Sequence, residues 1–297
     1  MTLPFIVVAP PYTASSNGIR VLHKLCGTLN RLGRSSAIAI LNEPEPMRQE
    51  IVVGGAEHVS KEYDTPLLGD LSRETIDSAY VIYPETLIGN PLQAKRVIRY
   101  FGNKEGLCNG QPIGMDSTEF VLCHSRILRK EYHYVLFDAW VHPAFNSEGT
   151  KPYSERTLDV SYIGKGYLYG PVGWISDTLW IERGWPRTKE QLALVLRNTR
   201  RFITWDSWSS INVEAVLCGA LPVFARTAPM TQEEIDTSEV GTIPRVDMEA
   251  KTAPTAEAYY YHKAQLEQRM RSIASTWEPR VAEFVTAVDQ YFNVAAG

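Results

Sequence analysis

A strand, a polar loop, a short helix and a second strand are predicted in succession over residues 202–224, FITWDSWSSINVEAVLCGALPVF. Phe202–Trp205 is an apolar, strand-forming run, Ile211–Cys218 has helical spacing, and Gly219 ends that helix before the strand Leu221–Phe224. A helix that begins just past the carboxyl end of a strand directs its first N–H groups into the ligand crevice of an open α/β sheet. These groups suit a phosphate.

Several side chains in this segment are suited to binding a nucleotide. Asp206 lies in the polar loop, Ser209, Ser210 and Ile211 mark the start of the helix, and Glu214 follows about one turn later. A carboxylate at that place could accept hydrogen bonds from a ribose diol while the helix start holds the phosphates. The combination predicts a nucleotide-sugar site. The alternative is that a serine only caps the helix and that Glu214 is a solvated surface residue.

A second motif, Gly164-Lys165-Gly166, ends the predicted strand Leu158–Ile163. Glycines permit a close approach of the backbone to a ligand, and the lysine offers a positive charge to a diphosphate. The same three residues are also typical of a tight exposed turn.

Strands and amphipathic helices alternate along the chain, which favours parallel, doubly wound sheets. The expected strands are Pro4–Ala9, Arg34–Leu41, Tyr80–Tyr83, Phe120–Cys123, His133–Phe137, Leu158–Ile163, Leu179–Ile181, Phe202–Trp205, Leu221–Phe224 and Thr242–Val246. The expected helices are Ile19–Leu32, Lys189–Leu196, Ile211–Cys218 and a C-terminal helix with Trp277, Val281, Phe284, Val288 and Phe292 at helical spacing.

A polar stretch with Gly and Pro at residues 146–154 predicts a linker between two α/β domains. The expected domains are 1–150, an N-terminal Rossmann-like domain, and 151–275, a second Rossmann-like domain that binds the donor. The segment 276–297 is expected to be a helix that packs back on the first domain.

Composition excludes some classes of protein. The 297 residues carry 30 basic and 34 acidic side chains, and this net charge of −4 does not favour non-specific binding to nucleic acid or anionic membranes. The four cysteines form no C-x-x-C pair and have the character of reduced core residues. The N-terminus has no basic region before its short apolar run, and no window is long enough to span a bilayer. We therefore expect a cytoplasmic protein without stable membrane insertion.

The residues Ser210, Glu214-Ala215, Gly219 and Pro222-Val223 resemble the donor-site signature of GT-B glycosyltransferases. The resemblance implies two Rossmann-like domains that face each other across a cleft, with a C-terminal helix that crosses back. It also implies that Glu214 binds the nucleotide ribose and that the preceding loop binds the diphosphate.

The resemblance extends to three further motifs. Lys165 is similar to the basic donor-phosphate residue of retaining GT-B enzymes, and the loop with Asn17 and Gly18 resembles their flexible glycine loop. Ser-Asn-Gly before a helix is equally typical of an ordinary cap and turn.

The run Tyr83-Pro-Glu85 followed by Gly89-Asn90-Pro91-Leu92 resembles glycosyltransferases of bacterial surface polysaccharides and their phage relatives. A strand that ends in Pro-Glu, followed by a turn into a helix, places Glu85 and Asn90 where acceptor hydroxyls could bind. Alternatively, Asn90 is the N-cap of that helix, with Pro91 in its first turn.

Together the motifs predict a metal-independent glycosyltransferase that moves a sugar from a nucleotide diphosphate sugar to an acceptor hydroxyl, with Lys165 and Glu214 as its catalytic residues. No D-x-D motif occurs that would hold a metal diphosphate, and no cofactor is expected. Retaining GT-B enzymes often have a second Glu seven residues before the ribose-binding one, where this chain has Ser207. The stereochemical outcome therefore stays open.

A glycan is the expected acceptor, and three alternatives stay open. A phage-type transferase would modify bases in DNA with the same donor chemistry. A nucleotide-sugar epimerase would need further acid and base residues. A non-catalytic module would bind the sugar or the nucleotide without turnover.

Overall fold

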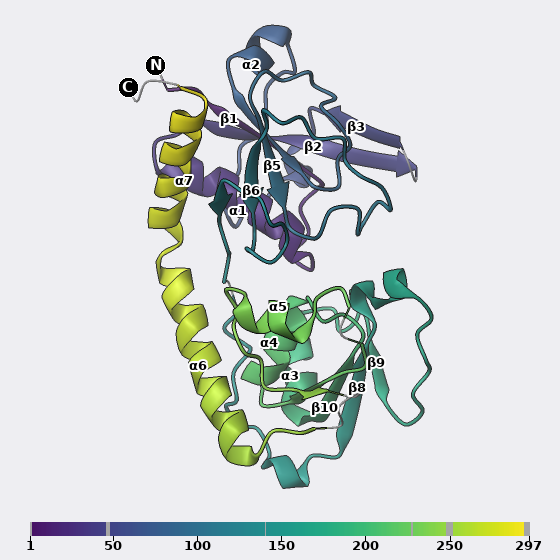
Figure 1. Cartoon of the computed structure of the whole chain (residues 1–297). Coiled ribbons are helices and arrows are strands. Elements are labelled where there is room, and N and C mark those ends of the chain that lie inside the picture. The colour runs from purple at the N-terminus through teal and green to yellow at the C-terminus, as the bar shows by residue number, and fades with distance from the viewer. Residues whose placement is uncertain (1, 46–47, 140, 227, 248–251, 294–297) are drawn as a thin grey trace. The chain divides into compact units, whose positions relative to one another are not determined.

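The computed structural model describes residues 2–45, 48–139, 141–226, 228–247 and 252–293. The chain divides into two compact units (Figure 1). Unit 1 combines Met1–Asp138 with Ser275–Gly297, and unit 2 comprises Ala139–Ala274. The chain therefore leaves unit 1 and returns to it near its C-terminal end. The sequence placed the corresponding boundaries at residues 150 and 275.

Unit 1 contains a seven-stranded sheet of order β3-β2-β1-β4-β5-β6-β7, in which all neighbours run parallel except β2 and β3. The strands are β1 (Phe5–Ala9), β2 (Ser36–Glu45), β3 (Arg48–Val52), β4 (Tyr80–Pro84), β5 (Val97–Phe101), β6 (Phe120–Cys123) and β7 (Tyr134–Val135). Strands β1, β4, β5 and β6 are buried along their whole length, as expected for parallel strands covered on both faces.

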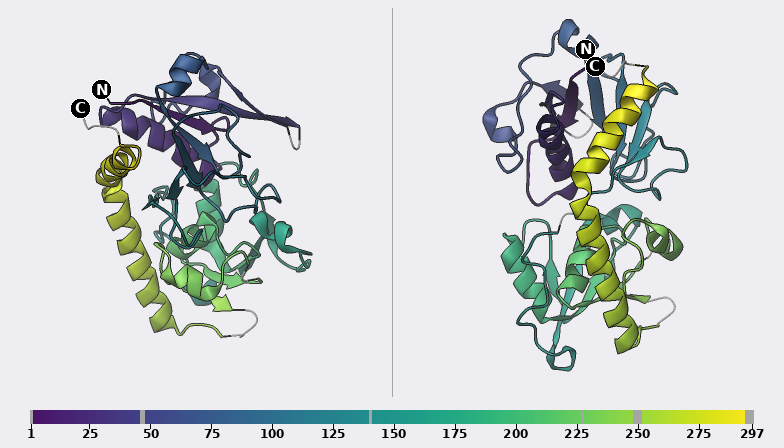
Figure 2. Two further views of the ribbon diagram at one scale, coloured as in Figure 1. Left: turned by 45° about the horizontal axis from the view of Figure 1, so that its top comes forward. Right: turned by 90° about the vertical axis from the view of Figure 1, so that its left-hand side faces the viewer.

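Helix α1 (Asn17–Arg31) packs on this sheet through the buried residues Val21, Leu22, Leu25, Cys26 and Leu29. The helix α7 (Trp277–Tyr291) lies beside α1 (Figure 2). A short helix, α2 (Arg73–Asp77), precedes β4.

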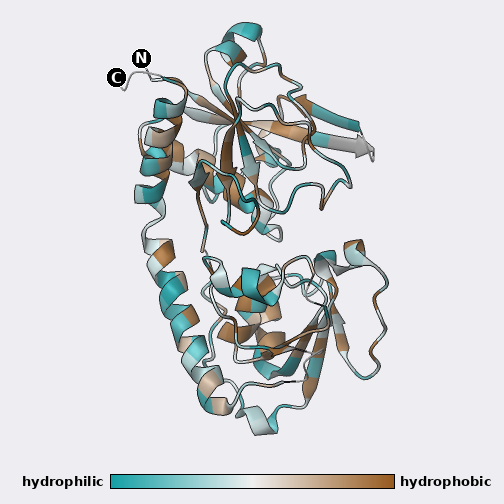
Figure 3. Ribbon diagram, in the orientation of Figure 1, coloured by the Kyte–Doolittle hydropathy of each residue, from teal (hydrophilic) through white to brown (hydrophobic). Residues whose placement is uncertain are grey.

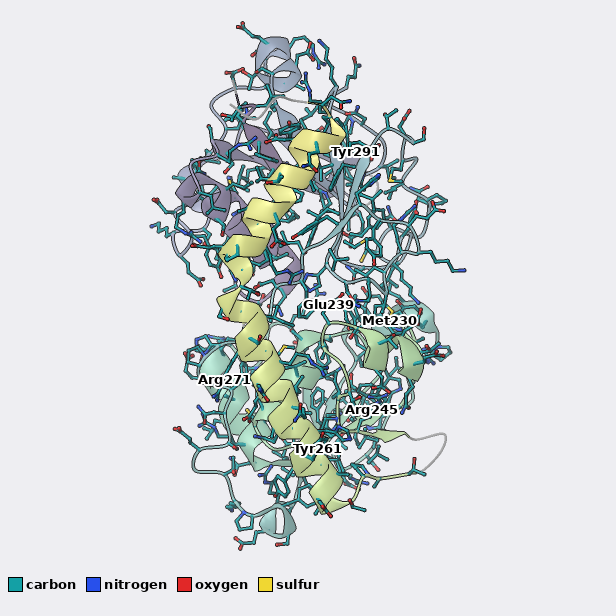
Figure 4. All side chains as sticks on the ribbon, turned by 60° about the vertical axis from the view of Figure 1, so that its left-hand side comes forward. Met230, Glu239, Arg245, Tyr261, Arg271 and Tyr291 are labelled. Atoms are coloured by element: carbon teal, nitrogen blue, oxygen red, sulfur yellow. The ribbon has the colours of Figure 1, made fainter. Side chains whose placement is uncertain are left out.

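The C-terminal helix α7 is part of the core of unit 1, as the sequence predicted. Phe284 is fully buried, and the Trp277 indole nitrogen donates a hydrogen bond of 2.8 Å to Thr28 Oγ1. Asp289 accepts a hydrogen bond of 2.7 Å from the Tyr80 hydroxyl. Tyr291, labelled in Figure 4, packs edge-on against Phe120.

Unit 2 contains a five-stranded parallel sheet of order β12-β11-β10-β8-β9. Its strands are β8 (Leu158–Tyr162), β9 (Leu179–Ile181), β10 (Thr199–Thr204), β11 (Leu221–Phe224) and β12 (Val246–Asp247). Its helices are α3 (Lys189–Asn198), α4 (Ser210–Leu217), α5 (Gln232–Thr237) and α6 (Ala256–Ser275). Hydrophobic residues concentrate on the strands of both sheets, whereas α6 is mostly hydrophilic (Figure 3).

Three tryptophans stack on one face of the unit 2 sheet. The ring centroids of Trp174 and Trp180 are 4.6 Å apart, and those of Trp180 and Trp205 are 5.7 Å apart, with nearly parallel planes. Trp205 is buried with Ile203 and Val223, whereas Trp174 is 77% exposed. The connection from β8 to β9 adds Ile163, Val172 and Ile175 to this apolar cluster, and the only helical element among its described residues is the 3₁₀ turn Gly164–Tyr169.

The sequence-based assignments differ from the structure in several places. No helix follows Asn90, because residues 91–95 form turns and bends, so the predicted turn into a helix and the N-cap alternative are both wrong. The strand expected at His133–Phe137 is confined to Tyr134–Val135. The one expected at Thr242–Val246 shares only Val246 with the observed strand Val246–Asp247. The sequence analysis missed β3, β5, α2, α5 and α6.

The fold-class prediction is confirmed in its main parts: two Rossmann-like α/β units with a C-terminal helix that belongs to the first. That the units face each other across a cleft stays a prediction. None of the helices in the described ranges has the length and hydropathy of a bilayer-spanning segment.

We predict that Phe284→Ala destabilises the protein by about 3–5 kcal/mol, because it leaves a cavity under α7 in the core of unit 1. Gln290→Ala, on the exposed side of the same helix, should change the free energy of unfolding by less than about 0.5 kcal/mol. Urea unfolding followed by circular dichroism measures both. Equal stability of the two variants would contradict the packing of α7 described above.

Candidate functional site

The order of the strands in unit 2 defines where a ligand is expected. From β8 the chain passes to β9 on one side and then to β10 on the other side of β8. In open parallel sheets a crevice forms outside the carboxyl ends of two strands at such a switch point. The segments that leave β8 and β10 here are Ile163–Tyr169 and residues 205–209, which are the two motifs that the sequence analysis selected. We call this place the switch-point edge.

The two glycines of Gly164-Lys165-Gly166 bring that motif into direct contact with the end of β10. A Cβ atom on Gly164, whose φ is +55°, would lie 2.6 Å from Asp206 Oδ2. A Cβ atom on Gly166 would lie 2.4 Å from Trp205 Cβ. The small size of Gly164 and Gly166 is therefore needed for the packing of this motif against the end of β10, before any ligand is considered.

Lys165 is held at both its backbone and its side chain. Its N–H donates a hydrogen bond of 2.9 Å to Asp206 Oδ2, and its Nζ lies 3.0 Å from the same oxygen. Nζ also donates to the carbonyl oxygen of Trp208 at 3.2 Å, just before α4 begins. Asp206 is 1% exposed, whereas the side chain of Lys165 keeps 16% of its surface. The ammonium group is thus directed toward the start of α4, and the lysine side chain stays partly exposed.

Among the described helices, the N-terminus of α4, like those of α1 and α7, has no side-chain cap, in contrast to three other helices. The N-cap residues Ser72, Thr188 and Thr231 of α2, α3 and α5 each accept a hydrogen bond from a first-turn N–H group. The α4 N-cap, Ser209, is extended and makes no such bond. Ser210 is exposed and Ile211 is buried in the first turn. The alternative that the Ser209 side chain caps this helix is therefore not supported.

Tyr162, the last residue of β8, lies beside this helix start. Burial raises the pKa of its hydroxyl, and the charge of Asp206 raises it further, while Arg183 and a hydrogen bond with Ser209 act in the opposite direction. The hydroxyl therefore stays protonated at neutral pH, as a neutral hydrogen-bonding group at the switch-point edge.

Two arginines that the sequence analysis missed follow β9 and β11, the strands that flank β8 and β10, at the same edge. Arg183 follows β9 and is exposed. Arg226 follows β11 and donates to the carbonyl oxygens of Gly166 and Pro171 at 3.3 and 3.0 Å. Within the described residues, no ion pair joins either arginine to a carboxylate. Together with Lys165 they place three cationic side chains at the carboxyl edge of this sheet, where Glu182 and Asp206 supply two carboxylates.

Glu214 lies in the second turn of α4 and is 4% exposed, so it is not a solvated surface residue. Its Oε1 is 3.1 Å from Nζ of Lys189, the first residue of α3. The pair anchors the carboxylate beside the first turn of a neighbouring helix. A sequence cannot indicate this partner, because the two residues are brought together only by the packing of α3 against α4.

In unit 1, three predicted residues lie at the corresponding switch point between β1 and β4. Asn17 and Gly18 begin α1 after β1, and Glu85 follows β4. The Asn17 Oδ1 atom is buried with no hydrogen-bond partner among the described residues, and a Cβ atom on Gly18 would meet nothing within 4 Å.

Glu85 and Asn90 are engaged with the protein itself. Glu85 is buried and accepts hydrogen bonds from the Gly102 N–H at 3.1 Å and the Asn103 side chain at 2.7 Å. Asn90 accepts from the Ala94 N–H and donates to the Ala94 carbonyl oxygen, both at 2.9 Å. These bonds hold the loops after β4 and β5 in place.

The structure thus brings together Gly164, Lys165, Gly166, Asp206, Ser209, Ser210 and Ile211 at one edge of unit 2, with Glu214 on the second turn of the adjoining helix. Asn17, Gly18, Glu85 and Asn90 belong to unit 1. The described residues include no cluster of three or more His, Cys, Asp or Glu side chains arranged to hold a metal ion.

A separate cavity of about 210 Å³ lies against α6 and contains none of the predicted site residues. It is lined by Thr242, Tyr261, His262, Gln265, Leu266 and Arg269. Tyr261 is labelled in Figure 4.

Comparison with known proteins gives distant structural likenesses alone. No family model and no curated protein matches the sequence. The solved structures that are similar include CalG4, the calicheamicin glycosyltransferase, with a TM-score of 0.41 and 11% identity over 100% of both chains. The glycotransferase of kitacinnamycin gives 0.43 and 12% over 98% of this chain and 100% of the other.

An alpha-glucosyltransferase in complex with UDP and DNA containing an HMU base gives a TM-score of 0.43 and 9% identity over 99% of each chain. All three structures are glycosyltransferases by name. Likenesses with TM-scores below 0.5 do not themselves assign a function to this chain.

We predict that Gly166→Ala destabilises unit 2 by about 1–3 kcal/mol, because the added methyl group collides with Trp205 and must separate the two motifs. Gly173→Ala is the matched control, since a Cβ atom there meets nothing within 4 Å. Thermal unfolding and tryptophan fluorescence measure the difference. An unchanged melting temperature and spectrum in Gly166→Ala would contradict the close contact.

Proposed function

We propose that this chain is a glycosyltransferase that moves a sugar from a nucleoside diphosphate sugar to an acceptor hydroxyl. The observation that carries the proposal is the placement of the Lys165 ammonium group. It lies 3.0 Å from Asp206 Oδ2 and 3.2 Å from the Trp208 carbonyl oxygen, beside the start of α4 and at the switch-point edge. A positive side chain next to a helix N-terminus at this place is suited to a diphosphate.

The proposed reaction needs positive groups where its negative charge develops. The bond between the anomeric carbon and the β-phosphate oxygen breaks, and the acceptor oxygen forms the new bond as its hydroxyl loses a proton. The departing nucleoside diphosphate gains charge in the transition state. Lys165 and the first N–H groups of α4 would stabilise that charge, with Arg183 and Arg226 nearby on the same edge. In this proposal these groups neutralise the diphosphate without a metal ion.

Glu214 is the proposed ribose ligand. A carboxylate accepts more than one hydrogen bond, so its ion pair with Lys189 at 3.1 Å is compatible with a bond from a ribose hydroxyl. Lys189 would then hold the carboxylate in one orientation. The carboxylate of a solvated glutamate on a helix surface would not be held in this way.

Unit 1 is the proposed acceptor-binding part. Gly18 and Asn17 begin α1 at the switch point of this unit, and the buried Asn17 Oδ1 atom needs a donor that the described residues do not supply. Hydroxyl groups are donors of this kind. Glu85 and Asn90, at the loops after β4, are retained as candidates by their position.

The proposal predicts release of nucleoside diphosphate from a panel of nucleotide sugars, and a loss of turnover of about 10²–10³-fold in Lys165→Ala. Lys151→Ala, with an exposed lysine of the same unit, should turn over like the parent protein. Mass spectrometry of the products, with and without EDTA, measures both. The acceptors offered in this experiment should include glycans and DNA with hydroxymethylated bases.

The outcomes of this panel separate the candidate functions. Sugar transfer to one acceptor class identifies it, and a changed sugar on the nucleotide without transfer indicates an epimerase. Binding of nucleotide sugars without any reaction indicates a non-catalytic module. Equal turnover by Lys165→Ala and the parent protein would refute the assigned site.

We predict that Glu214→Gln weakens nucleoside diphosphate binding about tenfold or more, because a hydrogen bond from the ribose to a charged acceptor is weakened. Inorganic pyrophosphate has no ribose, and its affinity should not change. Isothermal titration calorimetry with both ligands measures the contrast. Equal losses for the two ligands would mean that Glu214 acts only through the structure of α4.

A further inference from the structure

The carboxylate of Asp206 joins the two motifs of the switch-point edge. Its Oδ2 atom accepts the Lys165 N–H at 2.9 Å and lies 3.0 Å from the Lys165 ammonium nitrogen. The absence of a side chain on Gly164 gives this oxygen room, since a Cβ atom there would be 2.6 Å away. One oxygen atom thus holds both the backbone N–H and the side-chain ammonium group of Lys165.

The burial of Asp206 makes this contact obligatory. The residue is 1% exposed, and its second oxygen, Oδ1, has no hydrogen-bond partner among the described residues. A buried carboxylate without a positive partner is strongly unfavourable. Lys165 is the cation that forms an ion pair with it in the described part of the chain. The position of Lys165 is therefore constrained by a charge that cannot turn toward solvent.

We infer that Asp206 is the positioning residue of the site, and this inference rests on the proposed function. It aims the Lys165 ammonium group at the start of α4 before the donor binds, so that the group does not have to reorganise as the leaving group gains charge. Asp206 acts through Lys165 and does not itself contact the reacting atoms. This assignment replaces the direct donor contact that the sequence analysis expected for it.

The carboxylate has a second effect on the same site. Its negative charge, 3.0 Å from the ammonium nitrogen, offsets part of the attraction that Lys165 exerts on a free diphosphate. Asp206 therefore improves the placement of the positive charge and does not increase the affinity for the diphosphate. A positioning role and a simple binding role consequently predict opposite effects of removing this charge.

Asp206→Asn and Asp206→Ala test the inference, with Asp159→Asn as the matched control. The Asn side chain keeps an oxygen for the Lys165 N–H but loses the charge, whereas Ala loses both. Asp159 is also a buried carboxylate of unit 2 in ion pairs, with Arg200 and Arg201, but it lies near the start of β8. Its variant should keep the parent turnover.

We expect Asp206→Asn to bind inorganic pyrophosphate at least as tightly as the parent protein, by calorimetry, while kcat at saturating donor falls about tenfold or more. Hydrogen exchange at the Lys165 amide should be about tenfold faster in Asp206→Ala and close to the parent rate in Asp206→Asn. Parallel losses of affinity, kcat and melting temperature in Asp206→Asn would overturn the inference in favour of a structural role. An unchanged kcat would overturn it as well.

The measurements separate this inference from the proposed function. If the parent protein binds no pyrophosphate and releases no nucleoside diphosphate, the proposed function fails, and the positioning role for catalysis fails with it. If the parent protein does both and Asp206→Asn retains the parent kcat, the inference alone fails.

Discussion

The close contact between the segment after β8 and the end of β10 is the constraint on which the rest of unit 2 depends. Gly164 and Gly166 have no side chains, so the backbone of residues 164–166 can rest on Trp205 and Asp206. The buried Asp206 carboxylate then needs the cation that this backbone carries. Packing and electrostatics therefore select the same three residues, and the charged group at the switch-point edge is a consequence of how two parallel strands end side by side.

The same connection explains how a short chain covers its second sheet. Right-handed crossovers place the path from β8 to β9 on one face and the paths from β9 to β10 and β10 to β11 on the other, where α3 and α4 pack. The first path has no α-helix among its described residues. Its Ile163, Val172 and Ile175 pack with Trp180 and Trp205 against the strands there. The rings of Trp180 and Trp205 come from β9 and from the end of β10 and bury much area per residue, so the loop has little left to cover.

Local patterns predicted much of the fold, and long-range partners account for most of what they missed. Helices α1, α4 and α7 and strands β6, β9 and β11 were predicted nearly to the residue, because their apolar spacing is complete within each segment. Strand β5 was missed because Arg99 interrupts its apolar run. This arginine is buried with an ion pair to Glu119 and hydrogen bonds to the carbonyl oxygens of Leu87 and Gly89, all on other segments. The helix after Asn90 was wrong because the Asn90 side chain bonds the Ala94 backbone and closes a turn.

In the candidate site, too, local patterns revealed some residues, and others became visible only through long-range packing. Gly164, Lys165 and the start of α4 were found because each motif is short and lies where a strand ends. Arg183 and Arg226 were missed because each is a single arginine with no motif around it. Only the strand order, which puts β9 and β11 on either side of β8 and β10, collects both arginines on the edge that carries Lys165. Residues directly after each predicted parallel strand therefore merit inspection as a set, since the sheet brings their positions together even when the sequence separates them widely.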